Sequence, residues 1–87
     1  MPLSRTNAEP AVEGLAVRFA MVNGKRQVTC WTRAATLEKL ENNPHLATEQ
    51  YLEAFHRHRD TLEAAASAIF DRGLLDGPNV VIRKENV

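Results

Sequence analysis

Residues 15–32, LAVRFAMVNGKRQVTCWT, decide the fold of this chain. Two β-rich runs flank the dipeptide Asn23-Gly24, which predicts a type I′ hairpin turn because both central residues of that turn need a positive φ. A two-residue turn fixes the register, and side chains then alternate between the two faces of the ribbon. The predicted register pairs Val22 with Lys25, Phe19 with Val28 and Val17 with Cys30.

The two faces of this ribbon differ in character. One is apolar and is expected to lie against the core; it holds Leu15, Val17, Phe19, Met21, Val28 and Cys30. The other is mostly polar apart from one large aromatic; it holds Ala16, Arg18, Ala20, Gln27, Thr29 and Trp31. The large side chain of Trp31 is therefore the unusual feature of the outer face.

The flanking sequence predicts two helices and a third strand. Thr32 is suited to cap a short helix over residues 33–41, and a long helix follows from Thr48 to Arg72, with Gly73 as the left-handed residue after its end. Residues 79–84, NVVIRK, are typical of a short strand. The chain is thus predicted to be a single α+β domain of order ββααβ, with a small antiparallel or mixed sheet and both helices on its apolar face.

Residues 1–14 contain two prolines, a glycine and few large apolar groups. Such a segment buries too little surface to offset its ordering entropy, which predicts a flexible or strap-like arm. The domain proper is expected over residues 15–87.

Length and composition narrow the protein class. Eighty-seven residues allow one small core, and 11 basic against 11 acidic side chains give a formal net charge of zero, so no overall field favours nucleic acid or membrane. The single cysteine excludes an internal disulfide and fits a reducing compartment. With neither a signal peptide nor an apolar run long enough for a bilayer, the sequence predicts a cytoplasmic protein.

The stretch AFHRHRD, residues 54–60, is the densest cluster of functional side chains. On a continuous helix, residues two apart point about 160° away from each other, so His56 and His58 cannot share a metal ion. The same geometry turns Arg57 to water, four residues after Glu53, and turns Arg59 toward the apolar arc. No metal site is predicted here.

A guanidinium cannot lose its proton, so an inward-facing Arg59 needs partners. The favoured interpretation is a structural role in which the guanidinium pairs with backbone carbonyls or with an acid such as Glu63, Asp76 or Glu85. Two alternatives stay open: an anion-binding site of Arg59 with His56 or His58, and a contact between subunits.

Catalytic motifs do not stand out. The four glycines occur singly at turns, there is no GxSxG, and Cys30 projects onto the apolar face, where thiols are usually inert. We expect neither an enzyme nor a cofactor.

The hairpin carries four basic residues and no acid between Gly14 and Leu37: Arg18, Lys25, Arg26 and Arg33. A two-stranded ribbon fits the DNA major groove, so nucleic-acid binding is one hypothesis. Basic strand faces are also ordinary, and burial of Trp31 by the arm or by a second subunit is preferred. The candidate contact surface consists of Arg18, Arg26, Gln27, Thr29 and Trp31.

Several of these residues also carry a family resemblance. The strand Val17-Arg18-Phe19, the turn glycine Gly24, the run Val28-Thr29-Cys30 and the helical pattern Phe55-x3-Arg59-x2-Leu62-x3-Ala66-x3-Phe70 resemble a bacterial family known as domain of unknown function 1488. The resemblance spans roughly residues 15–83 and departs from the family at Trp31, where a small aliphatic residue is expected. It implies a compact ββααβ domain in which Phe55 and Arg59 belong to the framework, and it brings no established activity.

Taken together, the sequence predicts a small cytoplasmic bacterial accessory or regulatory protein that acts through an unknown protein partner or as a homodimer. Nucleic-acid binding through the basic hairpin and anion binding near Arg59 are the alternatives.

Overall fold

A computed structural model describes residues 3–87 of the chain. Its sheet contains five strands: β1 (Ser4–Arg5), β2 (Ala11–Glu13), β3 (Ala16–Asn23), β4 (Arg26–Arg33) and β5 (Val80–Ile82). Its helices are α1 (Ala34–Glu41), α2 (Tyr51–Arg57) and α3 (Arg59–Asp71), with 3-10 turns η1 (Thr48–Gln50) and η2 (Lys84–Asn86). The predicted α+β class and the rough ββααβ order are confirmed.

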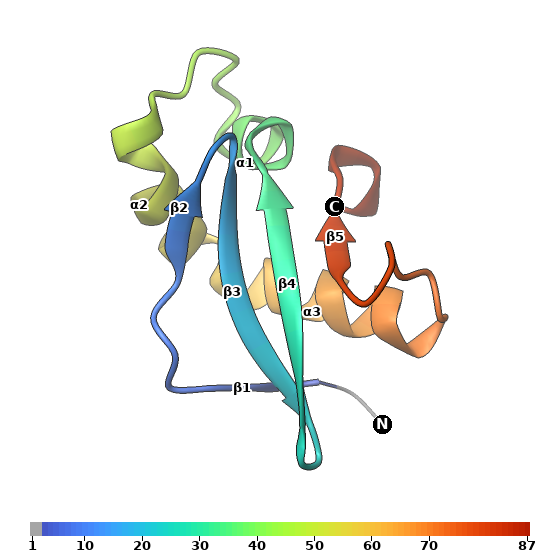
Figure 1. Ribbon diagram of the computed structural model, residues 1–87. Coiled ribbons are helices and arrows are strands. Elements are labelled where there is room, and N and C mark those ends of the chain that lie inside the picture. Colours follow the sequence, from blue (N-terminus) through green and yellow to red (C-terminus); the bar gives the residue numbers. More distant parts are fainter. Residues whose placement is uncertain (1–2) are drawn as a thin grey trace.

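The sheet is mixed. Its order is β1-β3-β4-β5, with β2 also on the β3 edge, and β4 pairs with β3 antiparallel and with β5 parallel. Segment 4–13 therefore runs along β3 as a strap made of β1 and β2 (Figure 1). Residues 1–2 of the predicted arm lie outside the described residues.

The predicted hairpin forms, but its register was wrong by two residues. Phe19 pairs with Cys30, and Asn23 pairs with Arg26, so the turn consists of Gly24 and Lys25. Only Gly24 takes a positive φ in this turn, +63°, as in a type II′ turn, which needs glycine at its first central position. A shift of two leaves every side chain on its predicted face, because the side-chain period of a strand is also two.

Leu15 is a second correction. It was placed on the core face but is 73% exposed. Gly14 and Leu15 form the turn between β2 and β3, with Gly14 at φ +60°, so the chain reverses before Leu15 can join the strand. The core-facing positions of β3 begin at Val17.

Thr32 is not the predicted helix cap. It is fully buried as a residue of β4, and helix α1 begins at Ala34 after Arg33, with no side-chain cap. Thr36 of α1 instead fastens the helix to the sheet, since its hydroxyl donates a 2.8 Å hydrogen bond to the carbonyl of Ile82.

The continuous helix from Thr48 to Arg72 was also wrong, because the chain breaks at His58 between α2 and α3. His58 has φ −112° and ψ 19°, and its amide is shared between the carbonyls of Ala54 and Phe55. A rod of 25 residues would be nearly 40 Å long, longer than the 36 Å of the longest dimension of the domain. The bend lets both helices bury their apolar arcs behind the same sheet, so tertiary packing overrides local helical continuity.

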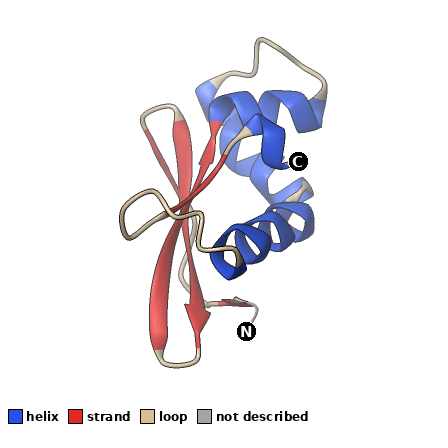
Figure 2. Ribbon diagram, turned by 90° about the vertical axis from the view of Figure 1, so that its right-hand side faces the viewer, coloured by secondary structure: helices blue, strands red, loops and turns tan. Residues whose placement is uncertain are grey.

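The core lies between the sheet and the helices (Figure 2). Phe55 is fully buried, and its ring centroid lies 4.9 Å from that of Phe19. At the end of α3, the predicted left-handed Gly73 is confirmed at φ +68°, and the amide of Leu74 reaches the carbonyl of Ile69 as a Schellman motif requires.

Candidate contact surface

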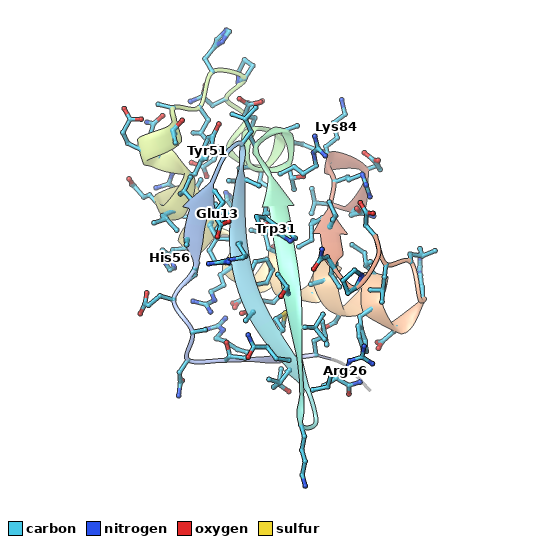
Figure 3. The ribbon with its side chains drawn as sticks, in the orientation of Figure 1. Glu13, Arg26, Trp31, Tyr51, His56 and Lys84 are labelled. Atoms are coloured by element: carbon cyan, nitrogen blue, oxygen red, sulfur yellow. The ribbon has the colours of Figure 1, made fainter. Side chains whose placement is uncertain are left out.

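The outer face of the sheet is left uncovered by the helices. Within residues 3–87, α1, α2 and α3 all lie on the inner face, against the buried side chains of β3 and β4 (Figure 2). Alternation along each strand then places the remaining side chains on the opposite face, which is the face seen in Figure 3.

The strand register builds one continuous row across this outer face. Ala11 pairs with Arg18, Arg18 with Trp31, and Trp31 with Val81, so the row spans β2, β3, β4 and β5. Trp31 is half-buried and lies within a hollow of about 380 Å³ between the strands and the loop before β5. An aromatic residue thus stands in the middle of an open sheet face.

Arg18 has a partner on this face that sequence reasoning missed. Its guanidinium lies 2.8 Å from a carboxylate oxygen of Glu13, which comes from the neighbouring strand β2. Glu13 lies beside Arg18 because β2 pairs with β3. Hydrophobic periodicity alone does not reveal this pairing, because β2 is only three residues long. The face is therefore of mixed charge and not a uniformly basic stripe.

The other predicted contact residues divide between two places. Gln27 and Thr29 lie on the outer face and line a hollow of about 250 Å³ with Arg18. Arg26 is exposed but alternates onto the other face, where it lines a separate hollow together with Phe70. Lys25 lies in the hairpin turn, and Arg33 lies at the opposite end of β4, lining the Trp31 hollow.

Arg59 is held inside an ion cluster. Its side chain is 17% exposed, its Nε donates a 3.0 Å hydrogen bond to Glu63, and its guanidinium carbon lies 5.6 Å from the centroid of the Phe55 ring. Of the acids Glu63, Asp76 and Glu85, it is thus Glu63 that pairs with Arg59.

Arg5 from the strap completes this cluster. It donates hydrogen bonds to both carboxylate oxygens of Glu63, at 2.7–3.0 Å, and to Asp60 at 2.9 Å. Burial is the largest influence on the pKa of Glu63 and opposes ionisation, but hydrogen bonds from Arg5 and Arg59 together outweigh it and lower that pKa. The charges of two arginines and two acids balance within the cluster.

His58 joins a second cluster at the helix break. Its Nε2 lies 2.6 Å from a carboxylate oxygen of Glu41, at the end of α1, and Glu41 also accepts hydrogen bonds from Arg57. Hydrogen bonds from Arg57 first, and from His58 second, lower the pKa of Glu41. Arg57 also pairs with Glu53 at 2.7 Å, the helical pair expected from the sequence. Glu41 was missed because only tertiary structure brings it to the helix break.

His56 stands apart from His58. It is exposed and contacts the edge of the Phe55 ring, with ring centroids 5.7 Å apart. Among residues 3–87, no group of three or more His, Cys, Asp or Glu side chains is arranged to hold a metal ion. Cys30 is buried, and burial first, then the charge of Glu63, raises the pKa of its thiol to about 12.

Comparison with known proteins places this geometry in a family. A family model described as "Protein of unknown function (DUF1488)" matches residues 7–78. The chain belongs to this family. A crystal structure of a DUF1488 protein of unknown function from Shewanella loihica PV-4 superposes with a TM-score of 0.82 at 18% identity, covering 93% of this chain and 91% of that chain. A search of curated proteins gave no match.

The similarity to the Shewanella protein shows that the DUF1488 fold extends over nearly the whole chain. The family model begins at residue 7, so β2 lies within the matched region and β1 lies before it. None of the described helices, in residues 3–87, is long and apolar enough to cross a membrane.

Proposed function

We propose that this DUF1488 protein is a non-catalytic accessory or regulatory module that acts through protein–protein contacts made by its outer sheet face. One observation carries the proposal: Trp31 lies in the middle of a sheet face that the described helices leave open. Tryptophan is enriched in the buried centres of protein interfaces and among the few residues that carry most of the binding energy.

The occupant that fits this face best is a second copy of the chain. A two-fold axis running along the strands between β3 and β4 would set Arg18 of each copy over Trp31 of the other. The same axis would bring Glu13 of one copy opposite Arg33 and Arg83 of the other. Within each copy, Glu13 is already paired with Arg18, and Arg83 with Asp76. Opposite charges therefore face each other across the axis, but the pairs formed within each copy limit what they add to the dimer.

The size of the face indicates how strong such a dimer is. The strands β3 and β4 have eight residues each, and β1, β2 and β5 add two or three residues each. At about 4.8 Å between strands and about 3.4 Å per residue, they give a face of roughly 400 Å² per copy. That area is below the roughly 800 Å² per partner of a standard stable interface. We therefore expect a dimer that dissociates at micromolar concentrations.

The charge pattern favours protein over nucleic acid. The Glu13 carboxylate neutralises Arg18 at the centre of the face, and phosphate binding depends on uncompensated positive charge. The anion-binding alternative has weaker support, because the charge of Arg59 is already matched by Glu63.

Sedimentation velocity over a range of protein concentrations tests the proposal. The unaltered protein should shift from monomer to dimer as concentration rises, whereas Trp31→Ala should stay monomeric over the same range. Leu74→Ala is the matched control, since it removes a leucine that is 62% exposed and lies outside the sheet, and it should dimerise normally. A protein that is monomeric throughout, or a dimer that survives Trp31→Ala, would contradict the proposal.

A heparin column at low salt separates the nucleic-acid alternative. Retention that is lost on Arg18→Ala or Arg26→Ala would favour nucleic-acid binding. We expect the protein to pass through unretained.

A further inference from the structure

The edge of β4 is only partly covered. On its β3 side, β4 is paired along all eight residues, but on its other side β5 pairs only with Cys30, Trp31 and Thr32. Figure 1 shows the β3–β4 hairpin continuing well beyond β5. Among residues 3–87, no strand pairs with this side of segment 26–29.

Antiparallel pairing determines which backbone groups point to the uncovered side. The pair Asn23–Arg26 closes the hairpin turn and exchanges hydrogen bonds, so alternate residues along β4 direct their N–H and C=O groups away from β3. Counting from Arg26, these are Gln27, Thr29 and Trp31. At Trp31 the outward groups meet β5, whose pairing is centred on Val81.

Gln27 therefore offers its N–H and its C=O to an additional strand, and Thr29 offers its N–H, while the parallel register Cys30–Val80 occupies the carbonyl of Thr29 with the amide of Val80. Unpaired edge groups of this kind are a template for strand addition. In peptide recognition by strand addition, backbone hydrogen bonds provide affinity, and pockets for alternate side chains provide specificity.

A hollow of about 330 Å³ adjoins this stretch of edge. The far wall is formed by Phe70 at the end of α3 and by the loop before β5, which contributes the apolar Leu75 and Pro78 and the polar Asn79. Leu75 is 39% exposed, so part of its side chain is accessible to a ligand in this hollow. Arg26 lines the same hollow and is exposed near the hairpin turn (Figure 3).

We propose that this edge binds a short extended peptide segment of a partner protein, which adds as a strand in line with β5. Its residues facing the helices alternate with those facing outward, so an apolar side chain would meet Phe70 and Leu75 while an acidic side chain two residues away would meet Arg26. The ligand class is thus an extended peptide with an apolar and an acidic residue separated by one position.

A second copy of β4 is a poorer occupant of the same edge. Antiparallel pairing of Gln27 with Thr29 of the other copy would bring the Arg26 position of that copy level with Cys30. Val80 of β5 already pairs with Cys30, so the turn of the second hairpin would collide with β5. A separate peptide has no such turn.

Two labelled peptides, acetyl-TLTDT-amide and acetyl-TDTLT-amide, provide probes for the two possible strand directions. Titration of the full chain, followed by NMR, should move the backbone amide signals of Gln27 and Thr29 for one of them. If neither peptide at millimolar concentration moves these signals, or if the shifts gather around Trp31 and Arg18 instead, the proposal is wrong.

A charge exchange tests the contact with Arg26. Arg26→Glu should weaken binding of the acidic peptide about fivefold and strengthen binding of the same peptide with lysine in place of its aspartate. Lys84→Glu makes the same change in net charge at η2 and should change neither affinity appreciably. If the two variants change peptide affinity equally, the effect comes from net charge alone, and the proposed contact between Arg26 and the peptide is wrong.

A backbone variant keeps the test independent of side-chain charge. Gln27→Pro removes an N–H that points away from β3, so it should abolish peptide binding while the hairpin persists. Full affinity in a folded Gln27→Pro variant would contradict strand addition. Trp31→Ala should leave peptide binding unchanged even though it prevents dimerisation. The dimer proposal and the peptide proposal can therefore be rejected independently.

Discussion

The two faces of the β3–β4 hairpin come from the same sixteen residues of strand and yet do different work. The inner face is covered by helices at Val17 and Phe19, and this part of it fixes the fold. The outer face carries Arg18 and Trp31 in adjacent strands and is left open. Alternation therefore lets one ribbon provide both a core and a contact surface, and substitutions on the two faces should have separable effects.

The largest effect is expected where helix α2 covers the inner face. Phe55→Ala removes a fully buried ring that packs on Phe19, so it should lower the free energy of unfolding by about 3–5 kcal/mol. Urea denaturation followed by circular dichroism measures this loss. A loss below about 1 kcal/mol would show that the inner face does not hold the fold as described.

Two buried threonines provide a finer comparison within the covered side. The Thr36 hydroxyl bonds the carbonyl of Ile82, whereas the hydroxyl of Thr32 is buried without a hydrogen-bond partner among the described residues. Thr36→Val should therefore destabilise the protein by about 1 kcal/mol, while Thr32→Val should stabilise it by a similar amount. Thermal unfolding of the two variants checks this, and shifts of the same sign would contradict it.

Much of the inner face could be predicted from the sequence. The alternation of Val17, Phe19 and Met21 against Val28 and Cys30 identifies the buried side even though the register was wrong by two residues. The break at His58 could not be predicted, because helical periodicity continues across it and only the packing behind the sheet ends α2.

The outer face was partly predictable. Trp31 and Arg18 were identified from alternation, but Glu13 was missed since it depends on β2 returning along β3. The open edge at Gln27 and Thr29 could not be predicted from the sequence either, because it depends on the short length of β5.

Lowering the pH should destabilise the protein on its helix side, because it protonates Glu63. Its pKa is lowered in the folded state, so the stability from its ionised form is fully present above the unfolded value of about 4.3 and is lost as pH falls through the folded value. Glu63→Gln should make the fall in melting temperature between about pH 5 and pH 2 shallower. An equally steep fall would contradict this role for the Arg5–Glu63–Arg59 cluster.

The smallest effect on stability is expected on the outer face. Trp31→Ala at a concentration where the protein is monomeric should change the free energy of unfolding by less than about 1 kcal/mol, since Trp31 lies on the outer face and loses mainly cross-strand contacts with Arg18 and Val81. Urea denaturation at submicromolar concentration measures this. A loss as large as that of Phe55→Ala would place Trp31 in the folding core.

Because Trp31 is the only tryptophan of the chain, its fluorescence reports directly on the open face. Emission and acrylamide quenching should be measured from submicromolar to high micromolar protein concentration, with Arg18→Glu as the comparison. We predict that emission shifts to shorter wavelength and quenching falls as the unaltered protein dimerises, and that both stay constant in Arg18→Glu. Emission and quenching that do not change with the concentration of the unaltered protein would contradict the claim that the outer sheet face is its contact surface.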